Sequence, residues 1–270
     1  MAAQPVAGTT EIAAPWPLPP GRAARLRLAT DYPYSAPRWD MLFRDGRVTP
    51  LAEAGEGARV AYGDRVPVLA HGSNRAPAQL ARKFHDFTGA RSAISVTYVW
   101  LHDHDVVYAA HLTHYGAVAS TLRPAPGTRV RVAVTWLDEA QLARMHATEG
   151  GYGFGRLAGV QATPASDHPA APAPSDLAAG PGLYLNDHGA YAPGGTPWGL
   201  AAVPATGRVL PGRTQGQVQE ALRRIIAPEA AFEPFVLAAV ADPAVRADRA
   251  RRLAAESSPA SLPAFRPWGP

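Results

Sequence analysis

The hydrophobic pattern is clearest between residues 66 and 160, where it predicts strands and helices in turn. Val66–Ala70 is a short apolar run typical of a buried strand. A helix is predicted over residues 76–87, because its apolar residues share one face. These are Leu80, Phe84 and Phe87. Four more apolar runs predict strands: Ile94–Leu101, Val106–His111, Ala117–Leu122 and Val130–Trp136. The segment His102–Asp105 separates the first two, and a turn at Pro124–Gly127 the last two.

A second helix is predicted from Asp138 to Glu149. Asp138 is a favoured N-cap residue, and Gln141 three positions later completes a capping-box pair. Gly150 and Gly151 follow directly, and glycine commonly ends a helix. Glu149 is therefore expected at the end of this helix.

The flanking regions carry weaker signals. Residues 1–25 are rich in proline and alanine and predict an extended arm. Turn residues predict hairpins at Asp45-Gly46 and across Pro193–Gly195, and a surface loop over residues 163–182. Capping patterns predict helices from Thr214 to Ile226 and from Asp242 to Glu256, followed by an extended tail. The resulting division is 1–65 as an arm with added strands, 66–160 as the core, and 161–270 as an extension packed on that core.

Composition narrows the classes of protein that fit. There is no apolar run long enough for a membrane helix and no cysteine, so we expect no membrane association and a cytoplasmic location. The net charge is +4, but the arginines are scattered and lack interleaved aromatics, so no nucleic-acid partner is expected. Lys83 is the single lysine, and arginine supplies all the other basic side chains.

Two elements carry candidate chemistry. After the Val66–Ala70 strand, Gly72 allows close backbone approach, and Ser73 and Asn74 are natural N-caps for the next helix. Free N–H groups at a helix start attract a carboxylate or carbonyl oxygen. Glu149 lies at a helix C-terminus, where the dipole disfavours a carboxylate and so favours proton exchange. We interpret the loop as an anion cradle and Glu149 as a general acid/base.

Together these residues resemble the gamma-glutamylcyclotransferase-like superfamily, which has a strand ending in Tyr-Gly-Ser-Asn. Here the motif reads His71-Gly72-Ser73-Asn74. The superfamily's second block, a proline-rich turn, a strand and a helix ending in Glu-Gly, corresponds to residues 121–150. The resemblance covers residues 66–160 and implies an α+β fold, a small mixed β-barrel with flanking helices, here with N- and C-terminal extensions.

The resemblance also implies an activity. Members cleave a γ-glutamyl amide when the substrate's own α-amine attacks its γ-carbonyl, which releases 5-oxoproline and a free amine. Glu149 would move the protons, and residues 71–74 and Tyr152 would bind a small substrate that carries a carboxylate and an amine. His71 stands where the superfamily has tyrosine. No metal or cofactor is implied, and the oligomeric state stays open.

Other hypotheses remain open at this stage. The same fold could be a non-catalytic module that binds a small molecule or a protein, or could catalyse a different amide or lyase reaction. His102, Asp103, His104 and Asp105 suggest a metal site, but two histidines do not complete one. A serine-hydrolase triad around Ser73 lacks the nucleophile-elbow pattern.

Overall fold

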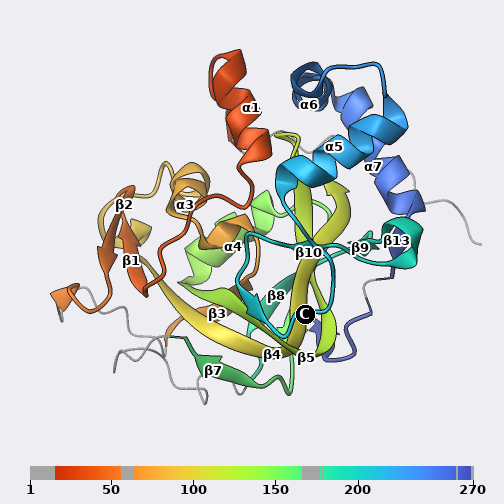
Figure 1. The fold of residues 1–270 in the computed structure, drawn as a ribbon. Coiled ribbons are helices and arrows are strands. Elements are labelled where there is room, and N and C mark those ends of the chain that lie inside the picture. Colours follow the sequence, from red (N-terminus) through yellow and green to blue (C-terminus); the bar gives the residue numbers. More distant parts are fainter. Residues whose placement is uncertain (1–15, 56–63, 166–176, 178, 260, 269–270) are drawn as a thin grey trace, which may run out of the picture.

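The protein is described here from a computed structural model that covers residues 16–55, 64–165, 177, 179–259 and 261–268. Most of the predicted arm (1–15) and most of the predicted surface loop (166–176 and 178) lie outside the described residues. In the part of the chain that is described, six α-helices accompany a mixed, mostly antiparallel sheet of fourteen strands. The predicted α+β class is confirmed (Figure 1).

The main path of the sheet has eight strands. In spatial order they are β12 (Gly212–Arg213), β10 (Gly199–Leu200), β4 (Ile94–Leu112), β5 (Val118–Leu137), β3 (Val66–Ala70), β8 (Gly182–Asn186), β6 (Tyr152–Leu157) and β14 (Phe265–Pro267). Only β3–β8 and β10–β12 are parallel pairs among the described strands. The two ends of the path, β12 and β14, do not pair with each other, so the described strands do not close into the predicted barrel.

Shorter strands attach beside this path. They are β1 (Met41–Arg44), β2 (Arg47–Pro50), β7 (Ala162–Pro164), β9 (Ala190–Tyr191), β11 (Ala205–Thr206) and β13 (Ser257–Ser258). The predicted turn at Asp45-Gly46 joins β1 and β2, and both residues have positive φ, 49° and 72°. The predicted hairpin across Pro193–Gly195 is wrong, because β9 and β10 each pair with β4 instead of with each other.

The four strands predicted between residues 94 and 136 are two long ones. β4 and β5 run through the polar and proline-rich segments and pair with each other on both sides of them. The pairing is irregular at two places, between Tyr108 and Leu112 and between His102 and His104. At the second place Asp103 has φ 56° and its Oδ1 accepts a hydrogen bond from the Gly127 N–H at 2.8 Å. Prolines are tolerated in such a bulge, since no ladder hydrogen bond is needed there.

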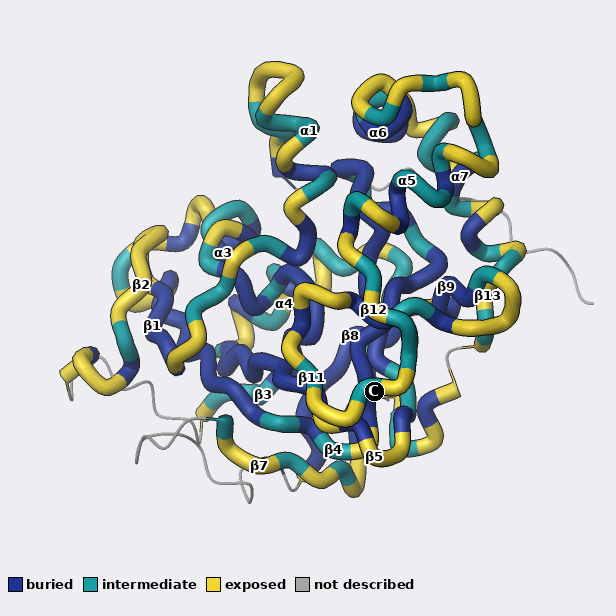
Figure 2. The backbone as a smooth tube through the Cα atoms, viewed as in Figure 1, coloured by how far each residue is buried: buried dark blue, intermediate teal, exposed yellow. Residues whose placement is uncertain are grey.

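The two faces of the sheet are covered by different helices. Alternate residues of β4 point to opposite faces: Ile94, Val96 and Tyr98 join one core cluster, and Val99 and Leu101 the other. Helices α3 (Pro77–Lys83) and α4 (Glu139–Thr148) pack on the first cluster, which also contains Leu80, Phe84 and Phe87 as predicted. The second cluster takes side chains from α1 (Arg22–Thr30), α5 (Gln215–Ile226), α6 (Phe232–Ala241) and α7 (Pro243–Ala255). Burial is therefore deepest along the central strands (Figure 2).

Helix α1 corrects the prediction of an extended arm through residue 25. The proline-rich stretch ends at Pro20, and after Gly21 the chain is rich in alanine, leucine and arginine, which favour helix. α1 packs against α6, which comes from the C-terminal part of the sequence, and both helices lie at the top of Figure 1. The remaining capped helices, α5 and α7, begin where the sequence predicts.

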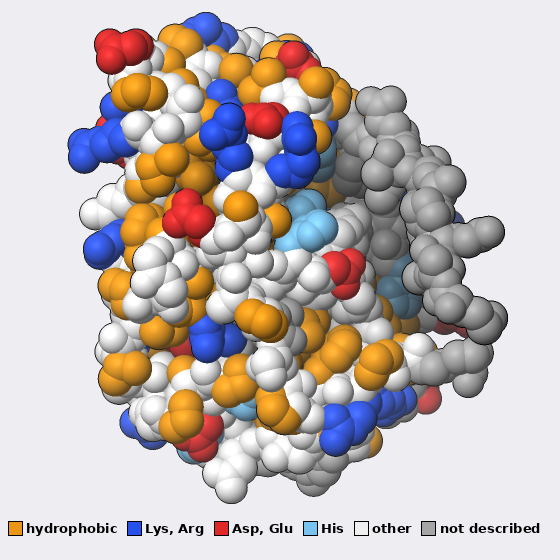
Figure 3. All heavy atoms as spheres, turned by 90° about the vertical axis from the view of Figure 1, so that its right-hand side faces the viewer, with side chains coloured by type: hydrophobic (Ala, Val, Ile, Leu, Met, Phe, Trp, Pro, Cys, Tyr) orange, Lys and Arg blue, Asp and Glu red, His pale blue; other side chains and the backbone are white. Residues whose placement is uncertain are grey.

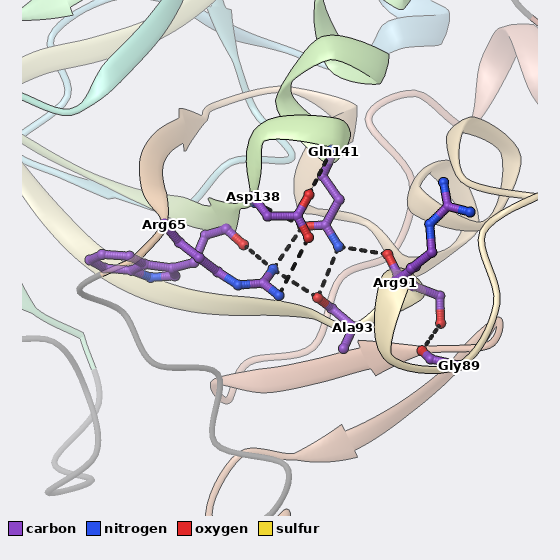
Figure 4. A network of polar contacts seen from close by, with 8 residues as sticks. Arg65, Gly89, Arg91, Ala93, Asp138 and Gln141 are labelled. Atoms are coloured by element: carbon purple, nitrogen blue, oxygen red, sulfur yellow. Dashed lines mark hydrogen bonds and ion pairs between the residues drawn. The ribbon is translucent and has the colours of Figure 1, made fainter.

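The start of α4 is held by a buried polar network (Figure 4). Asp138 and Gln141 form the predicted capping box. Gln141 also accepts from Arg65 Nη1 at 2.7 Å and donates to the Ala93 carbonyl at 3.0 Å. Because the side-chain oxygen and nitrogen of Gln141 both form hydrogen bonds, the start of α4 is connected to the residue before β4 and to the residue before β3. The opposite end of α4 then presents Glu149 at a defined place.

Candidate functional site

A cavity of about 460 Å³ lies at the end of β3. Its walls come from the segment after β3, from α3, from the β4–β5 turn, from the end of α4 and from α7. Trp16 and Tyr32 before β1 also contribute. The structure brings all six residues singled out in the sequence to this one cavity: His71, Gly72, Ser73, Asn74, Glu149 and Tyr152. The volume lies in the range of small-molecule sites.

Glu149 is the C-cap of α4 and its side chain is 12% exposed. Its Oε1 accepts a hydrogen bond from Asn74 Nδ2 at 2.7 Å, so the loop after β3 and the end of α4 are directly joined. The same Oε1 forms a close ion pair with Lys83 Nζ from α3. No partner for Oε2 is found among the described residues, so Oε2 is the atom that a ligand can reach.

Lys83 was missed as a site residue. Its side chain is only 2% exposed and its ammonium also contacts Met145 Sδ at 3.3 Å. Burial lowers the pKa of Lys83, and the negative charge of Glu149 opposes that shift. One signal was present in the sequence: this is the single lysine of a chain that otherwise uses arginine.

The Gly72–Asn74 segment differs from the predicted cap. Ser73–Arg75 form a short 3₁₀ turn, and the N-cap of α3 is Ala76, so neither Ser73 nor Asn74 caps that helix. Among the described residues no acceptor is found for the backbone N–H groups of Gly72, Ser73 and Asn74. These groups are therefore open to an oxygen of a ligand. Asn74 Oδ1 is buried and also without a partner in the described structure.

Gly72 is required for close packing. A Cβ at this position would lie 2.4 Å from Tyr32 Oη and 2.6 Å from Ser120 Oγ. These two close contacts leave no room for a side chain, so they require glycine here. Tyr32 thus lies directly against the candidate loop, although it is forty positions earlier in the sequence.

His71 lines the cavity, but both ring nitrogens are engaged. Nε2 lies 3.2 Å from the Tyr184 carbonyl oxygen, which can only accept, so Nε2 carries the hydrogen. Nδ1 then accepts from Ser120 Oγ at 3.1 Å, and Ser120 in turn accepts from Tyr32 Oη at 2.7 Å. Burial lowers the pKa of His71, which agrees with a neutral ring. His71 therefore positions Ser120 and Tyr32 and has no free nitrogen for a ligand.

Tyr152 forms part of the wall opposite the loop. Its hydroxyl donates to the Ser120 carbonyl at 2.8 Å, and its ring packs edge-on against His111 with centroids 5.9 Å apart. Burial raises the pKa of Tyr152, and the nearby Tyr32 and Glu149 act in the same direction. Tyr152 thus remains a neutral hydroxyl whose proton is already donated.

His114 also lines the cavity, in surroundings that disfavour its protonated, positively charged form. Burial lowers its pKa to about 4, and the positive charges of Arg246 and Lys83 act in the same direction. Its ring packs edge-on against Trp16 with centroids 4.5 Å apart. Neither its Nε2 nor Trp16 Nε1 has a partner in the described structure.

This geometry predicts acid-sensitive stability. The folded pKa of about 4 lies below the ordinary 6.5, so the contribution of neutral His114 is present above pH 6.5 and is lost as pH falls toward 4. We expect His114 to account for about 2 kcal/mol of the stability lost between about pH 7 and pH 5. Urea unfolding of His114→Phe should show a shallower pH dependence. His85→Phe, which removes an exposed imidazole, is the control; equal slopes in wild type and His114→Phe would contradict the prediction.

The suggested metal segment has protein partners instead. His102 Nε2 lies 3.1 Å from Thr163 Oγ1, and His104 Nδ1 lies 2.6 Å from the His102 carbonyl. Asp105 is buried in an ion pair with Arg208. The bulge at Asp103 also interrupts the strand alternation that would put His102 and His104 on the same face of the sheet. Among the described residues no group of three or more His, Asp or Glu is arranged to hold a metal ion.

The surface and the comparisons add little to the identity of a ligand. On the face shown in Figure 3, Lys and Arg side chains are spread among hydrophobic and polar groups and form no continuous stripe. Within the described ranges, no helix combines the length and the hydropathy needed to cross a bilayer. No protein-family model matches the chain, and neither a curated protein nor a solved structure matches it.

Proposed function

We propose that this protein is a gamma-glutamylcyclotransferase-like enzyme that cleaves a γ-glutamyl amide, or a related small amide, without water as nucleophile. The observation that carries the proposal is the shared cavity of Glu149 and the open N–H groups of the Gly72–Asn74 loop, joined by the 2.7 Å bond between Asn74 and Glu149. Asn74 of the loop and Glu149 are 75 positions apart in the sequence. Their convergence is what the proposed chemistry requires.

In the proposed reaction, Glu149 Oε2 takes a proton from the α-ammonium of the substrate. The freed amine attacks the γ-carbonyl carbon, and a new C–N bond closes the five-membered ring. Backbone N–H groups of the loop stabilise the negative oxygen that develops on that carbon. Glu149 returns the proton to the leaving nitrogen as the original amide C–N bond breaks, and the ring nitrogen gives its second proton to the released amine, which leaves as an ammonium. The products are 5-oxoproline and a free amine.

The test is product analysis with the purified wild-type protein. A panel of γ-glutamyl amino acids, γ-glutamyl peptides and γ-glutamyl alkylamines should include a substrate that gives 5-oxoproline and amine in equal amounts. The matched N-acetyl-γ-glutamyl compounds should give neither, because the attacking amine is blocked. Release of glutamate in place of 5-oxoproline would assign the cleavage to a water nucleophile and contradict the proposal.

A binding module is the second candidate, and one observation favours it. The carboxylate of Glu149 is already engaged within the protein, because its Oε1 is paired with the buried ammonium of Lys83 and accepts from Asn74. In this alternative the cavity would hold a small ligand and release it unchanged. Saturable binding of the panel compounds by calorimetry, without any product, would support it.

The superfamily proposal extends to the fold and the location. It would assign the long strands β4 and β5, which bend in Figure 1, together with β3 to a small mixed β-barrel, although the described strands leave it open. The cytoplasmic location remains a prediction from the sequence. The division into an arm, a core and an extension also remains a prediction, although all three ranges contribute side chains to the larger core cluster.

A further inference from the structure

The ion pair between Lys83 and Glu149 costs desolvation, since Lys83 is 2% exposed and Glu149 12%. A buried ion pair is often no more stabilising than apolar residues of the same size. Stability alone is therefore a weak reason for an ammonium at this place in the core. The cavity gives a better reason for the ammonium, because its partner Glu149 is the one acid among the described residues that line the cavity.

The residue type points the same way. The chain uses arginine for every basic side chain except this one. The Lys83 ammonium contacts Glu149 Oε1 and Met145 Sδ, and a compact ammonium has fewer N–H donors to satisfy in such a buried place than a guanidinium with five. A compact point charge is what the contact requires.

The contacts also divide the two oxygens of Glu149. Lys83 and Asn74 both donate to Oε1, and no described residue bonds to Oε2. The carboxylate is thus held at one oxygen and free at the other. The ammonium of Lys83 also places a positive charge directly against this partly buried carboxylate.

We propose that Lys83 is a positioning residue for the candidate reaction: it fixes Glu149 through Oε1 and holds its positive charge against the carboxylate, so that Oε2 is left to face the ligand. This inference rests on the proposed function for its kinetic consequence. Its electrostatic part, the coupling of Lys83 to Glu149, stands whether or not the protein turns over a γ-glutamyl compound.

The kinetic test compares pH profiles of kcat/KM for wild type, Lys83→Met and Lys83→Arg on an active panel compound. Lys83→Met removes the positive charge that contacts the carboxylate form of the acid. The acid limb of Lys83→Met should therefore move to higher pH by about one unit or more, and its activity should approach wild type at alkaline pH. Lys83→Arg should restore part of the shift, because it keeps the charge. Arg251→Met, which removes an exposed cation, should leave the profile unchanged.

A purely structural role for Lys83 gives a different result. The Lys83→Met variant would then lose activity by the same factor at every pH, with the acid limb unmoved, and this outcome would overturn the proposal. Thermal unfolding of each variant shows whether the protein is folded during the assay.

A second measurement needs no activity. Protein labelled with ¹⁵N-lysine has a single side-chain signal, from Lys83, whose titration can be followed by nuclear magnetic resonance. In Glu149→Gln the signal should titrate at least about one pH unit lower than in wild type, because the stabilising negative charge is gone. Equal titration in the two proteins would overturn the proposal. If the coupling is present but no panel compound yields 5-oxoproline, it is the proposed function that fails.

Discussion

Glu149→Gln is expected to lower the release of 5-oxoproline by about 10²- to 10⁴-fold, the usual contribution of a general acid or base. The amide keeps the size of the side chain and can accept from Asn74 or Lys83, so the cavity should keep its shape. It cannot carry the proton from the α-ammonium to the leaving nitrogen. The loss should therefore appear in kcat as well as in kcat/KM.

The matched control is Glu139→Gln at the other end of α4, outside the cavity lining. It removes a carboxylate from the same helix and should retain wild-type kinetics. Full activity of Glu149→Gln in the presence of an active wild-type enzyme would remove Glu149 from the mechanism. It would leave the Gly72–Asn74 loop as a binding element only.

Arg208→Met is expected to destabilise the protein by about 3–5 kcal/mol, because it leaves Asp105 buried without its counter-ion. The Asp105 side chain is 0% exposed, and Arg208 holds both of its oxygens, with Nη2 2.7 Å from Oδ1 and Nε 2.9 Å from Oδ2. Arg208 also donates to the Val203 carbonyl at 3.1 Å. The pair therefore ties the C-terminal region to the middle of β4.

Urea unfolding measures this effect, and a double variant tests its cause. Arg208→Met combined with Asp105→Leu removes both charges and should recover most of the lost stability. Arg224→Met, which breaks an exposed pair on α5, should cause no measurable change. If Arg208→Met unfolds with the wild-type midpoint, Asp105 is hydrated despite its burial and the expectation is wrong.

The local elements could largely be predicted because their signals are short-range. The capping boxes at Asp138 and Thr214 each lie within four residues and formed as expected. The apolar spacing of Leu80, Phe84 and Phe87 likewise identified the face that α3 and the residues after it bury. α1 was missed because the prolines before it dominated the interpretation of that region.

Long-range pairing could not be predicted from the same signals. Prolines and the histidine–aspartate run predict breaks in the strands. β4 and β5 nevertheless continue through them, because the two strands pair on both sides of the bulge and Asp103 Oδ1 accepts a hydrogen bond from the Gly127 N–H across it. The connection of β9 and β10 to β4, in place of a hairpin, depends on which strand edges remain open after β4 and β5 have paired.

For the candidate site, the loop His71–Asn74, the acid Glu149 and their neighbour Tyr152 could be identified from local features of the chain, namely a strand end, a helix end and a turn. That they share one cavity, that Lys83 pairs with Glu149 and that His71 is engaged by Ser120 and Tyr184 follows from the folded structure alone. These contacts join residues 49 to 113 positions apart. Residues this far apart become buried together and form ion pairs when the sheet folds and helices cover its two faces. No local pattern in the chain encodes these contacts.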